Sequence, residues 1–484
     1  MGGAPAQAQP TPSPSSSGHP TRTPSGKPGD RTPTGGTHSA TGGDHKGDRP
    51  GTQRGRKHKP APTRGPVLAP LADAKDGAPT DRGLQQSLTT PLQDKSLGTL
   101  TFAVADAATG RLLLGSGETT PGTPASTTKL ATAVAALALL PADFRMTTRV
   151  VQGATPGEIT LVGGGDPLLT ALPQDQVRVG GATVDQETAP ASLADLARQT
   201  AASLKAAGTT SVKLGFDTSL YSGDLLHKEH DGTNIAAVTP LMIDEGRVDP
   251  RSAEEAPARV ADPAAQAAEA FAALLRAEGI TVQGRAAAGR AGAGAQQLGA
   301  VLSPTVPRLV ERMLTTSDNT LAEAVARQVA VAAGKPASFE GAAGAVTTVL
   351  KGLGVPLTGV VINDGSGLSK ANLIPPVTLV KLLAAASAPD HPELRPVVTG
   401  LPIAGFTGTL VNRFGAKSGA GEAAGIVRAK TGTLSGVNTL AGTVVDADGR
   451  VLAFALMTRT SAGPDVARAA VDRIVARIAA CGCH

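Results

Sequence analysis

Alternation of apolar and polar residues is clearest in two regions that lie far apart along the chain. Residues 97–116 alternate, turn at 107–110 and alternate again, a pattern that predicts a β-hairpin. Near the other end, residues 426–436 predict one strand, 438–459 predict a second hairpin, and 464–480 predict a closing helix. We therefore expect one antiparallel sheet that both ends of the chain close and that helices cover, which is an α+β fold.

The middle of the chain has a different pattern. Short strands with glycine-rich ends alternate there with amphipathic helices at 192–208 and 263–278. This predicts an inserted mixed α/β module at 146–299. The flanking stretches 67–145 and 300–484 then form the main α+β domain.

The first 66 residues differ from the rest in composition and charge. They hold no Val, Ile, Leu, Phe or Tyr, so they cannot bury enough apolar area to offset the entropy of ordering. We predict a disordered tail at 1–66, whose ten Lys/Arg and three Asp give a net charge of +7. It is either a solvated spacer or a tether that contacts an anionic cell wall or membrane surface, and its composition leaves both interpretations open.

Several classes of protein are excluded by the remaining 418 residues. They hold 35 Lys/Arg against 37 Asp/Glu, a net charge of −2, and the whole chain has only eight Phe, one Tyr and no Trp. No nucleic-acid partner is therefore expected. The longest apolar run, 130–140, is too short to span a bilayer, and residues 1–20 carry no apolar signal-peptide region.

Cysteine supports no disulfide framework, because the chain has only Cys481 and Cys483. Two hypotheses remain open. The pair either forms a strained bridge across one residue or consists of two free thiols in a disordered end.

Histidine is poorly placed for catalysis. Five of the eight histidines lie in the tail or at the last position, which leaves His227, His230 and His391. None lies in a motif that indicates a Ser-His-Asp triad. His227 and His230 flank Glu229 in a polar loop, and we interpret this group as a loop rather than a metal site, so no metal ligands are predicted.

A serine hydrolase without histidine needs another base, and the sequence Ser126-Thr-Thr-Lys129 supplies one. At a helix N-terminus, positions i and i+3 share a face, so the Lys129 amine lies near the Ser126 hydroxyl. Burial and cationic neighbours lower a lysine pKa and let the amine accept the serine proton. The positive end of the helix also favours a developing oxyanion.

Two further motifs follow in order. Ser317-Asp318-Asn319 opens a second predicted helix, and Lys430-Thr431-Gly432-Thr433 lies on a predicted strand. The succession S-x-x-K, S-D-N and K-T-G is the signature of the penicillin-binding and class A β-lactamase group. By contrast, the glycine-rich stretch 163–167 and the sequence around Ser366 are interpreted as turns, since neither completes a phosphate-binding loop or a nucleophile elbow.

The chain resembles the class C low-molecular-mass penicillin-binding proteins, the D-alanyl-D-alanine carboxypeptidases/endopeptidases of peptidase family S13. The resemblance covers about 67–480 and rests, beyond the three motifs, on five stretches: 161–169, 315–325, 363–376, 401–414 and 428–442. It implies a serine β-lactamase/penicillin-binding transpeptidase-like domain with an insertion between Ser126 and Ser317, which lie 191 residues apart.

The resemblance also implies a role for each catalytic residue. Ser126 is expected to be the acylated nucleophile and Lys129 the base. Ser317 is expected to relay a proton to the leaving D-alanine and Asn319 to bind the substrate amide, and Lys430 is counted among the catalytic residues. No metal or organic cofactor is implied.

A second group is expected to bind substrate. Lys430, Thr431 and Thr433 bind the terminal carboxylate. Gly432 lets the strand approach the substrate closely, and the backbone N–H groups of Ser126 and Thr433 form the oxyanion hole. In the family, an acidic residue of the inserted module binds the free amine of diaminopimelate, and approximate matching places that acid at Glu229 or Asp231.

The expected partners are peptidoglycan stem peptides as substrates and β-lactam antibiotics as covalent inhibitors. The expected location is extracytoplasmic, either secreted or associated with the cell envelope, with the export or anchor segment absent from this sequence. Two alternatives stay open: a β-lactamase-related serine hydrolase or esterase, and a non-catalytic peptidoglycan-binding protein.

Overall fold

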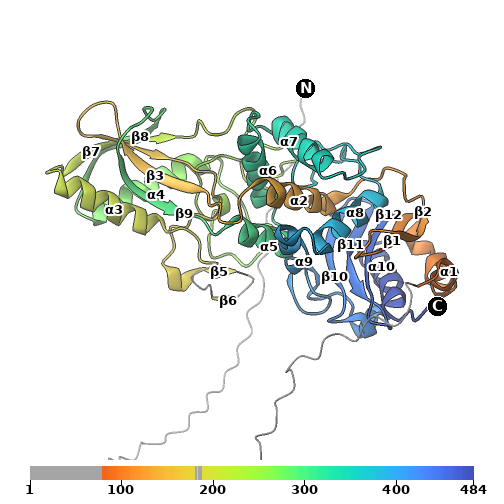
Figure 1. Ribbon diagram of the computed structural model, residues 1–484. Helices are drawn as coiled ribbons and strands as arrows, with labels where there is room; N and C mark the ends of the chain where they lie inside the picture. Colours follow the sequence, from red (N-terminus) through yellow and green to blue (C-terminus); the bar gives the residue numbers. More distant parts are fainter. Residues whose placement is uncertain (1–78, 180–181, 184–187, 484) are drawn as a thin grey trace, which may run out of the picture. The chain divides into compact units, whose positions relative to one another are not determined.

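The computed structural model describes residues 79–179, 182–183 and 188–483, and Figure 1 labels most of their helices and strands. The predicted disordered tail at 1–66 lies outside these residues. Within the described part of the chain, no helix is both long and apolar enough to cross a bilayer.

A five-stranded antiparallel sheet joins the two ends of the described chain. Its order is β10 (Arg428–Leu434), β11 (Val437–Val445), β12 (Val451–Arg459), β1 (Thr99–Asp106) and β2 (Leu112–Ser116). The pairing of β1 with β12 brings strands from opposite ends of the sequence together. Both predicted hairpins and the predicted closure of the sheet are confirmed.

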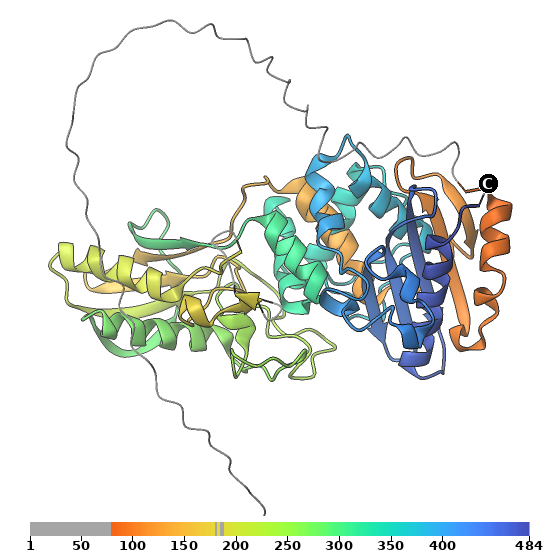
Figure 2. The same ribbon diagram turned by 90° about the horizontal axis from the view of Figure 1, so that it is seen from below.

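The alternation within β1 explains why helices cover both faces of this sheet. Phe102 and Val104 enter one apolar core, which contains α1 and α10, whereas Ala103 and Ala105 enter another, which contains α2 and α8. Figure 2 shows the strands between α2 on one side and α1 on the other. The helices around this sheet are α1 (Asp81–Leu88), α2 (Lys129–Leu139), α5 (Val306–Thr316), α6 (Asn319–Ala332), α7 (Phe339–Gly352), α8 (Pro376–Ser387), α9 (Arg395–Thr399) and α10 (Pro464–Ala479).

A second five-stranded sheet forms the inserted module. Its order is β8 (Thr281–Ala288), β7 (Ser211–Asp217), β4 (Glu158–Val162), β3 (Thr147–Gln152) and β9 (Gln297–Leu302). The β3 contacts are antiparallel and the β4–β7 and β7–β8 contacts are parallel, so the sheet is mixed.

Two helices bury their apolar sides against this mixed sheet: α3 (Leu193–Ala206) and α4 (Pro263–Ala277). A small ribbon, β5 (Arg178–Val179) with β6 (Ala182–Thr183), completes the module. The sequence pattern did not indicate β9, and the expected boundary at residue 300 falls inside this strand.

Residues 218–262, which we call the bridging segment, connect β7 to α4 and contain only one short 3₁₀ turn, Asp244–Gly246. Although they lie within the inserted module in sequence, they pack against the helices around the first sheet. Tyr221 joins a small apolar cluster with Phe339 of α7. The fully buried Arg327 of α6 donates hydrogen bonds to the carbonyls of Ser222 and Asp224. The insertion therefore reaches the α6 region through an irregular segment.

The C-terminal cysteines are paired, and the hypothesis of two free thiols in a disordered end is wrong. Cys481 and Cys483 form a disulfide, and Cys481 is buried beside α10 and α1. The carbonyl of Cys483 accepts a hydrogen bond of 2.8 Å from the N–H of Thr80, the N-cap residue of α1.

Candidate active site

Ser126 lies in a 3₁₀ turn, Ala125–Thr128, that runs directly into α2. The preceding Ala125 has φ = 48°, a left-handed conformation that non-glycine residues rarely adopt. The turn is held from the first sheet, since Thr439 Oγ1 on β11 donates to the Pro124 carbonyl at 2.8 Å.

Gly432 explains how the sheet approaches so closely. A Cβ atom at this position would collide first with Thr439 Oγ1 on β11, and it would also lie 2.7 Å from the Pro124 oxygen and 3.1 Å from Ala125 Cβ. The close approach that the missing side chain permits is thus between β10 and the Ser126 turn. The expected close approach of substrate at Gly432 stays a prediction.

Lys129 is the first residue of α2 and its side chain is fully buried. Its Nζ lies 3.0 Å from Ser126 Oγ, 2.6 Å from Asn319 Oδ1 and 2.7 Å from the Ser366 carbonyl oxygen. Burial lowers the pKa of Lys129 to about 8, although nearby carboxylates, Asp364 foremost, act in the opposite direction. A substantial fraction of this amine is therefore neutral near physiological pH.

The second motif lies between α5 and α6. Ser317 has φ = 60° and ψ = 29°, and this left-handed residue ends α5 and redirects the chain. Asp318 caps α6 by accepting the N–H of Leu321 at 2.9 Å. Asn319 donates from Nδ2 to the carbonyl of Asn234, which belongs to the bridging segment, at 3.0 Å. Because this contact fixes the amide, Asn319 Oδ1 faces Lys129.

The third motif occupies β10, the edge strand of the first sheet. Lys430 is fully buried, and its Nζ donates to Ser317 Oγ and to the Thr431 carbonyl, each at 2.8 Å. Burial and the charge of Lys129 hold the pKa of Lys430 well below its usual value. Thr431 Oγ1 contacts Thr409 Oγ1 at 2.8 Å.

Thr433 has a neighbour that no motif in the sequence indicates. Arg468 of α10 donates from Nη2 to Thr433 Oγ1 at 3.3 Å. Its guanidinium is held on the other side by Asp465 at 3.3 Å. A cation thus lies beside one of the two threonines that are expected to bind a carboxylate.

A buried cluster of charges supports the second motif from behind, and sequence reasoning missed it. Glu245 of the bridging segment is fully buried and is hydrogen-bonded to Asp318. It pairs with Arg247 at 2.8 Å, Arg312 at 2.9 Å and Arg259 at 3.5 Å. Burial and the adjacent Glu245 raise the pKa of Asp318 to about 7, while the arginines outweigh burial and lower the pKa of Glu245.

The loop 363–372 lies beneath Lys129. The side chain of Glu323 on α6 accepts the N–H groups of Gly365, at 3.1 Å, and Ser366, at 2.8 Å. Ser366 thus serves through its backbone, as the interpretation of this stretch as a turn requires. Its carbonyl is one of the acceptors for Lys129.

The two candidate amine-binding acids differ in availability. Glu229 Oε2 lies 3.6 Å from Lys370 Nζ of the loop 363–372, and its side chain is 41% exposed. Asp231 instead uses Oδ1 to accept the N–H groups of Thr233 and Asn234, each at 2.8 Å, within its own turn. Glu229 is thus paired with a lysine of this loop, Asp231 bonds mainly within its own turn, and both acids stay candidates.

These features define a class of protein. The site has a serine and a lysine at the start of a helix, a left-handed serine in the second motif and a lysine on the edge strand of the sheet. This arrangement is typical of the active-site serine hydrolases of the β-lactamase and penicillin-binding fold.

Comparison with known proteins identifies the family within that class. A family model described as D-Ala-D-Ala carboxypeptidase 3 (S13) family matches residues 84–258 and 250–481. The chain therefore belongs to this family. The predicted family, fold and enzyme class, a serine-type D-Ala-D-Ala carboxypeptidase, are confirmed.

Individual relatives agree. The chain is similar to Carboxypeptidase DacB of Mycolicibacterium smegmatis, with 39% identity across 88% of this chain and 89% of the relative. It is similar to a D-alanyl-D-alanine carboxypeptidase of an Actinomadura species, with 30% identity across 84% of this chain and 86% of the relative. Its fold resembles the crystal structure of penicillin binding protein 4 from Haemophilus influenzae, with a TM-score of 0.64, 22% identity and coverage of 82% and 97%.

Proposed function

We propose that Ser126 forms the acyl-enzyme with the penultimate D-alanine of peptidoglycan stem peptides and that Lys129 is its base. The three contacts of Lys129 Nζ carry this proposal. A neutral amine has two N–H bonds and one lone pair. Asn319 Oδ1 and the Ser366 carbonyl accept the two hydrogens, which leaves the lone pair for the proton of the Ser126 hydroxyl.

In acylation, Ser126 gives its proton to Lys129 as its oxygen attacks the carbonyl carbon of the D-Ala-D-Ala bond. The backbone N–H groups of Ser126 and Thr433 stabilise the oxyanion. The leaving amine takes the hydroxyl proton of Ser317, and Lys430 replaces it across their 2.8 Å contact. In deacylation, water attacks the ester, its proton passes to Lys430, and Lys129 returns a proton to Ser126.

The terminal carboxylate of the substrate binds at Lys430, Thr431 and Thr433. Its negative charge stabilises the ammonium form of Lys430, which burial and Lys129 disfavour in the free enzyme. Arg468 adds a second cation beside Thr433.

A β-lactam presents a carboxylate next to a strained amide, so the same groups acylate Ser126. The amine of the opened ring stays attached to the acyl group and hinders water, which makes the β-lactam a covalent inhibitor.

Glu229 is our candidate for binding the free amine of the stem-peptide side chain, with Asp231 as the alternative acid. Partial exposure leaves the Glu229 carboxylate accessible, and the pairing with Lys370 places it at the loop beneath Lys129. A carboxylate–ammonium hydrogen bond in a partly dry site contributes about 1.5–3 kcal/mol. Peptides with the free amine are therefore cleaved faster than acetylated ones, and Glu229→Gln removes this preference but leaves penicillin acylation unchanged. Full retention of the preference in both Glu229→Gln and Asp231→Asn would show that the amine binds elsewhere.

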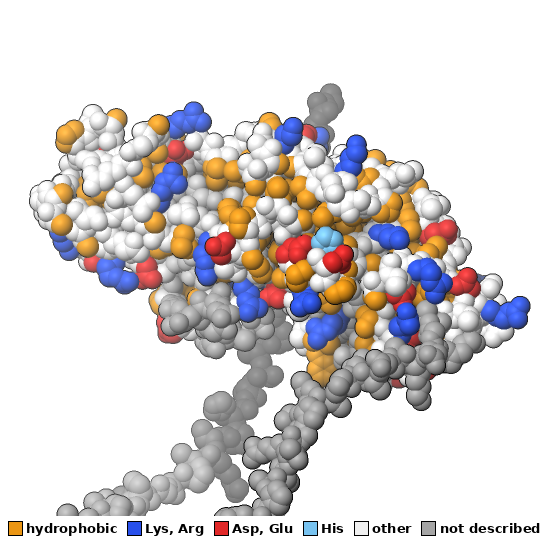
Figure 3. Space-filling view, viewed as in Figure 1, with side chains coloured by type: hydrophobic (Ala, Val, Ile, Leu, Met, Phe, Trp, Pro, Cys, Tyr) orange, Lys and Arg blue, Asp and Glu red, His pale blue; other side chains and the backbone are white. Residues whose placement is uncertain are grey.

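The substrate places the site of action outside the cytoplasm. On the face drawn in Figure 3, acidic and basic side chains are interspersed, and residues 67–484 have a net charge of −2. A body of mixed charge without a net positive charge does not favour a nucleic acid as its partner. Contact with an anionic wall or membrane surface is assigned to the basic residues of 1–66. Deletion of these residues weakens adsorption to cell wall, most at low salt, and leaves the cleavage of soluble peptide unchanged.

The test of the proposed function is D-alanine release from a pentapeptide that ends in D-Ala-D-Ala, measured beside cleavage of a cross-linked peptide dimer. Wild-type protein releases D-alanine, and Ser126→Ala releases none while keeping its unfolding temperature. Rapid repeated turnover of benzylpenicillin without D-alanine release would assign a β-lactamase instead. The ratio of the rate of D-alanine release to the rate of dimer cleavage measures the balance between carboxypeptidase and endopeptidase activity.

A further inference from the structure

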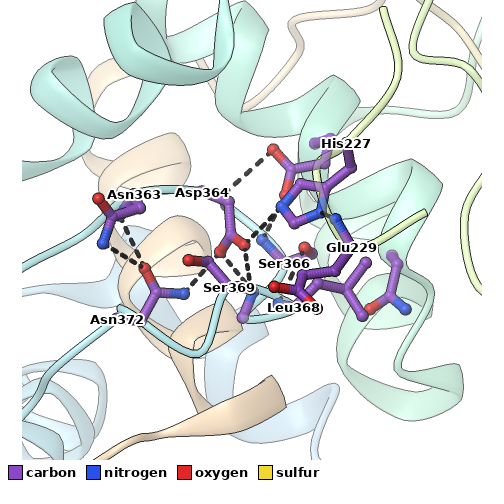
Figure 4. A network of polar contacts seen from close by, with 12 residues as sticks. His227, Glu229, Asn363, Asp364, Ser366, Leu368, Ser369 and Asn372 are labelled. Atoms are coloured by element: carbon purple, nitrogen blue, oxygen red, sulfur yellow. Dashed lines mark hydrogen bonds and ion pairs between the residues drawn. The ribbon is translucent and has the colours of Figure 1, made fainter.

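His227 of the bridging segment is buried at the point where that segment meets the loop 363–372 (Figure 4). Its Nε2 lies 2.9 Å from Asp364 Oδ2, and its Nδ1 accepts the backbone N–H of Glu229 at 3.0 Å. The ring contacts Phe339 of α7 edge-on, with 5.2 Å between ring centroids. Both ring nitrogens are therefore hydrogen-bonded, and the ring packs against an aromatic neighbour.

These contacts select one form of the imidazole. Since Nδ1 accepts a hydrogen bond from a backbone N–H, it carries no proton. The proton is on Nε2, which donates to the Asp364 carboxylate. The neutral Nε2–H tautomer is the form that satisfies both partners.

The Asp364 contact leads to Lys129. Asp364 also accepts the N–H groups of Gly367 at 2.8 Å and Ser369 at 2.6 Å. These bonds fold the loop 363–372 around a single carboxylate, and the carbonyl of Ser366 in the same loop accepts from Lys129 Nζ. A displaced Asp364 therefore displaces an acceptor that orients the base.

The Glu229 contact leads to the proposed substrate site. Because the backbone of Glu229 is hydrogen-bonded to Nδ1, the imidazole sets the start of the turn from which the Glu229 carboxylate reaches Lys370. Lys370 belongs to the same loop that Asp364 organises, so His227 is bonded directly to the Glu229 backbone and is linked to Lys370 only through Asp364.

We propose that His227 is a positioning residue with two separable tasks: Nε2–H holds the loop that orients Lys129, and Nδ1 holds the turn that presents Glu229 to the substrate amine. The second task rests on the proposed function of Glu229, whereas the first does not. Neither task requires His227 to touch the reacting atoms.

The same imidazole, with Glu323 and Asp364, offers three potential ligand atoms that lie within 4.8 Å of one another. The existing hydrogen bonds indicate a hydrogen-bonded network of side chains here rather than a metal site. Both oxygens of Glu323 accept backbone N–H groups, and both oxygens of Asp364 accept hydrogen bonds as well. A metal ion would have to replace these donors.

Protonation of His227 would release the Glu229 turn, because a proton on Nδ1 would face the N–H of Glu229. The charged groups around the ring are Asp364 of the loop, Glu323 of α6, and Glu229, which is paired with Lys370. Burial lowers the pKa of His227, but the hydrogen bond and charge of Asp364 outweigh burial and raise the pKa above its usual value. The preference for a free amine therefore falls as pH drops through that raised pKa.

Two substitutions separate the tasks. The amide nitrogen of glutamine approximates Nε2, so His227→Gln keeps a donor for Asp364 but gives Glu229 no acceptor. The amide oxygen of asparagine approximates Nδ1, so His227→Asn keeps the acceptor for Glu229 but does not reach Asp364. His391→Gln, at an exposed histidine, is the matched control.

The experiment measures penicillin acylation rates and the ratio of kcat/KM for peptides with free and acetylated amines. For His227→Asn we expect acylation about ten-fold slower with the ratio retained, and for His227→Gln acylation within about two-fold of wild type with the ratio near one. The control matches wild type. If the wild type has no amine preference, the assignment of Glu229 fails, and the acylation rates alone then decide the first task.

Equal losses of the penicillin acylation rate and of the amine preference in both variants, accompanied by a lowered unfolding temperature, would show a merely structural role and overturn the proposal. So would unchanged activity in both variants, or stoichiometric metal in wild-type protein that is absent from His227→Gln.

Discussion

The pH dependence of Ser126 acylation follows directly from the pKa of Lys129. With a pKa of about 8, about one tenth of the Lys129 side chains are neutral at pH 7, whereas an ordinary lysine at about 10.4 would leave roughly one in 2,500 neutral. Burial thus provides a few hundred times more free base. The acylation rate should rise about ten-fold per pH unit below pH 8 and level off above it.

Asp318→Asn tests this pH profile because it removes a negative charge near Lys129 and hardly changes the size and shape of the side chain. The Asp318 carboxylate raises the pKa of Lys129, so its neutralisation should move the midpoint of the profile to a pH below 8. Asparagine can still cap α6 at Leu321 and donate to Glu245, which preserves the present contacts.

The assay is the second-order rate of acylation by benzylpenicillin between pH 5.5 and 9.5, followed by intact-mass spectrometry after quenching. Enzyme that remains folded at each pH, checked by thermal unfolding, makes the rates comparable. A flat profile, a midpoint near the ordinary lysine pKa, or a shift of Asp318→Asn to higher pH would refute Lys129 as the titrating base.

Three further substitutions test a close contact beside Ser126 and two buried carboxyl groups. Gly432→Ala forces a Cβ against Thr439 Oγ1 and the Pro124 carbonyl, so acylation should fall about a hundred-fold, whereas Gly344→Ala, which meets no neighbouring atom, should not change it. Glu245→Gln leaves three arginines without their buried partner and should lower the free energy of unfolding by about 3–5 kcal/mol in urea titrations; a loss below about 1 kcal/mol would contradict this. Burial raises the pKa of Asp166 from 3.8 to about 7, and a raised folded-state pKa costs stability as pH rises through this window. Asp166→Asn should therefore raise the unfolding temperature at pH 8 and leave it unchanged below pH 4. An equal shift of the unfolding temperature at both pH values would contradict the raised pKa of Asp166 as its cause.

Local sequence patterns predicted the strands of the first sheet and the catalytic motifs because each depends on residues that are close together in the sequence. The alternation of Phe102 and Val104 with two alanines fixes the two faces of β1. The spacing of Ser126 and Lys129 brings their polar atoms together through the geometry of one helical turn. Such contacts need no knowledge of the rest of the fold.

The bridging segment was not predictable in the same way. It contains almost no regular structure, so no periodicity marks its buried side. His227 lies 137 residues from Asp364, and Glu245 gathers arginines from different parts of the chain, so only the folded chain brings these groups together. The placement of β9 likewise depends on its pairing with β3. Charged residues in a polar stretch look solvated until the fold buries them.

The central claim is that Ser126 is the nucleophile, and the most direct measurement is the intact mass of the protein after incubation with benzylpenicillin, followed by peptide mapping. The account predicts one penicilloyl group per chain, located on the peptide that contains Ser126, and none on Ser126→Ala, with both proteins showing the same unfolding temperature. A covalent adduct on Ser126→Ala, or a wild-type adduct that maps to another residue, would contradict it.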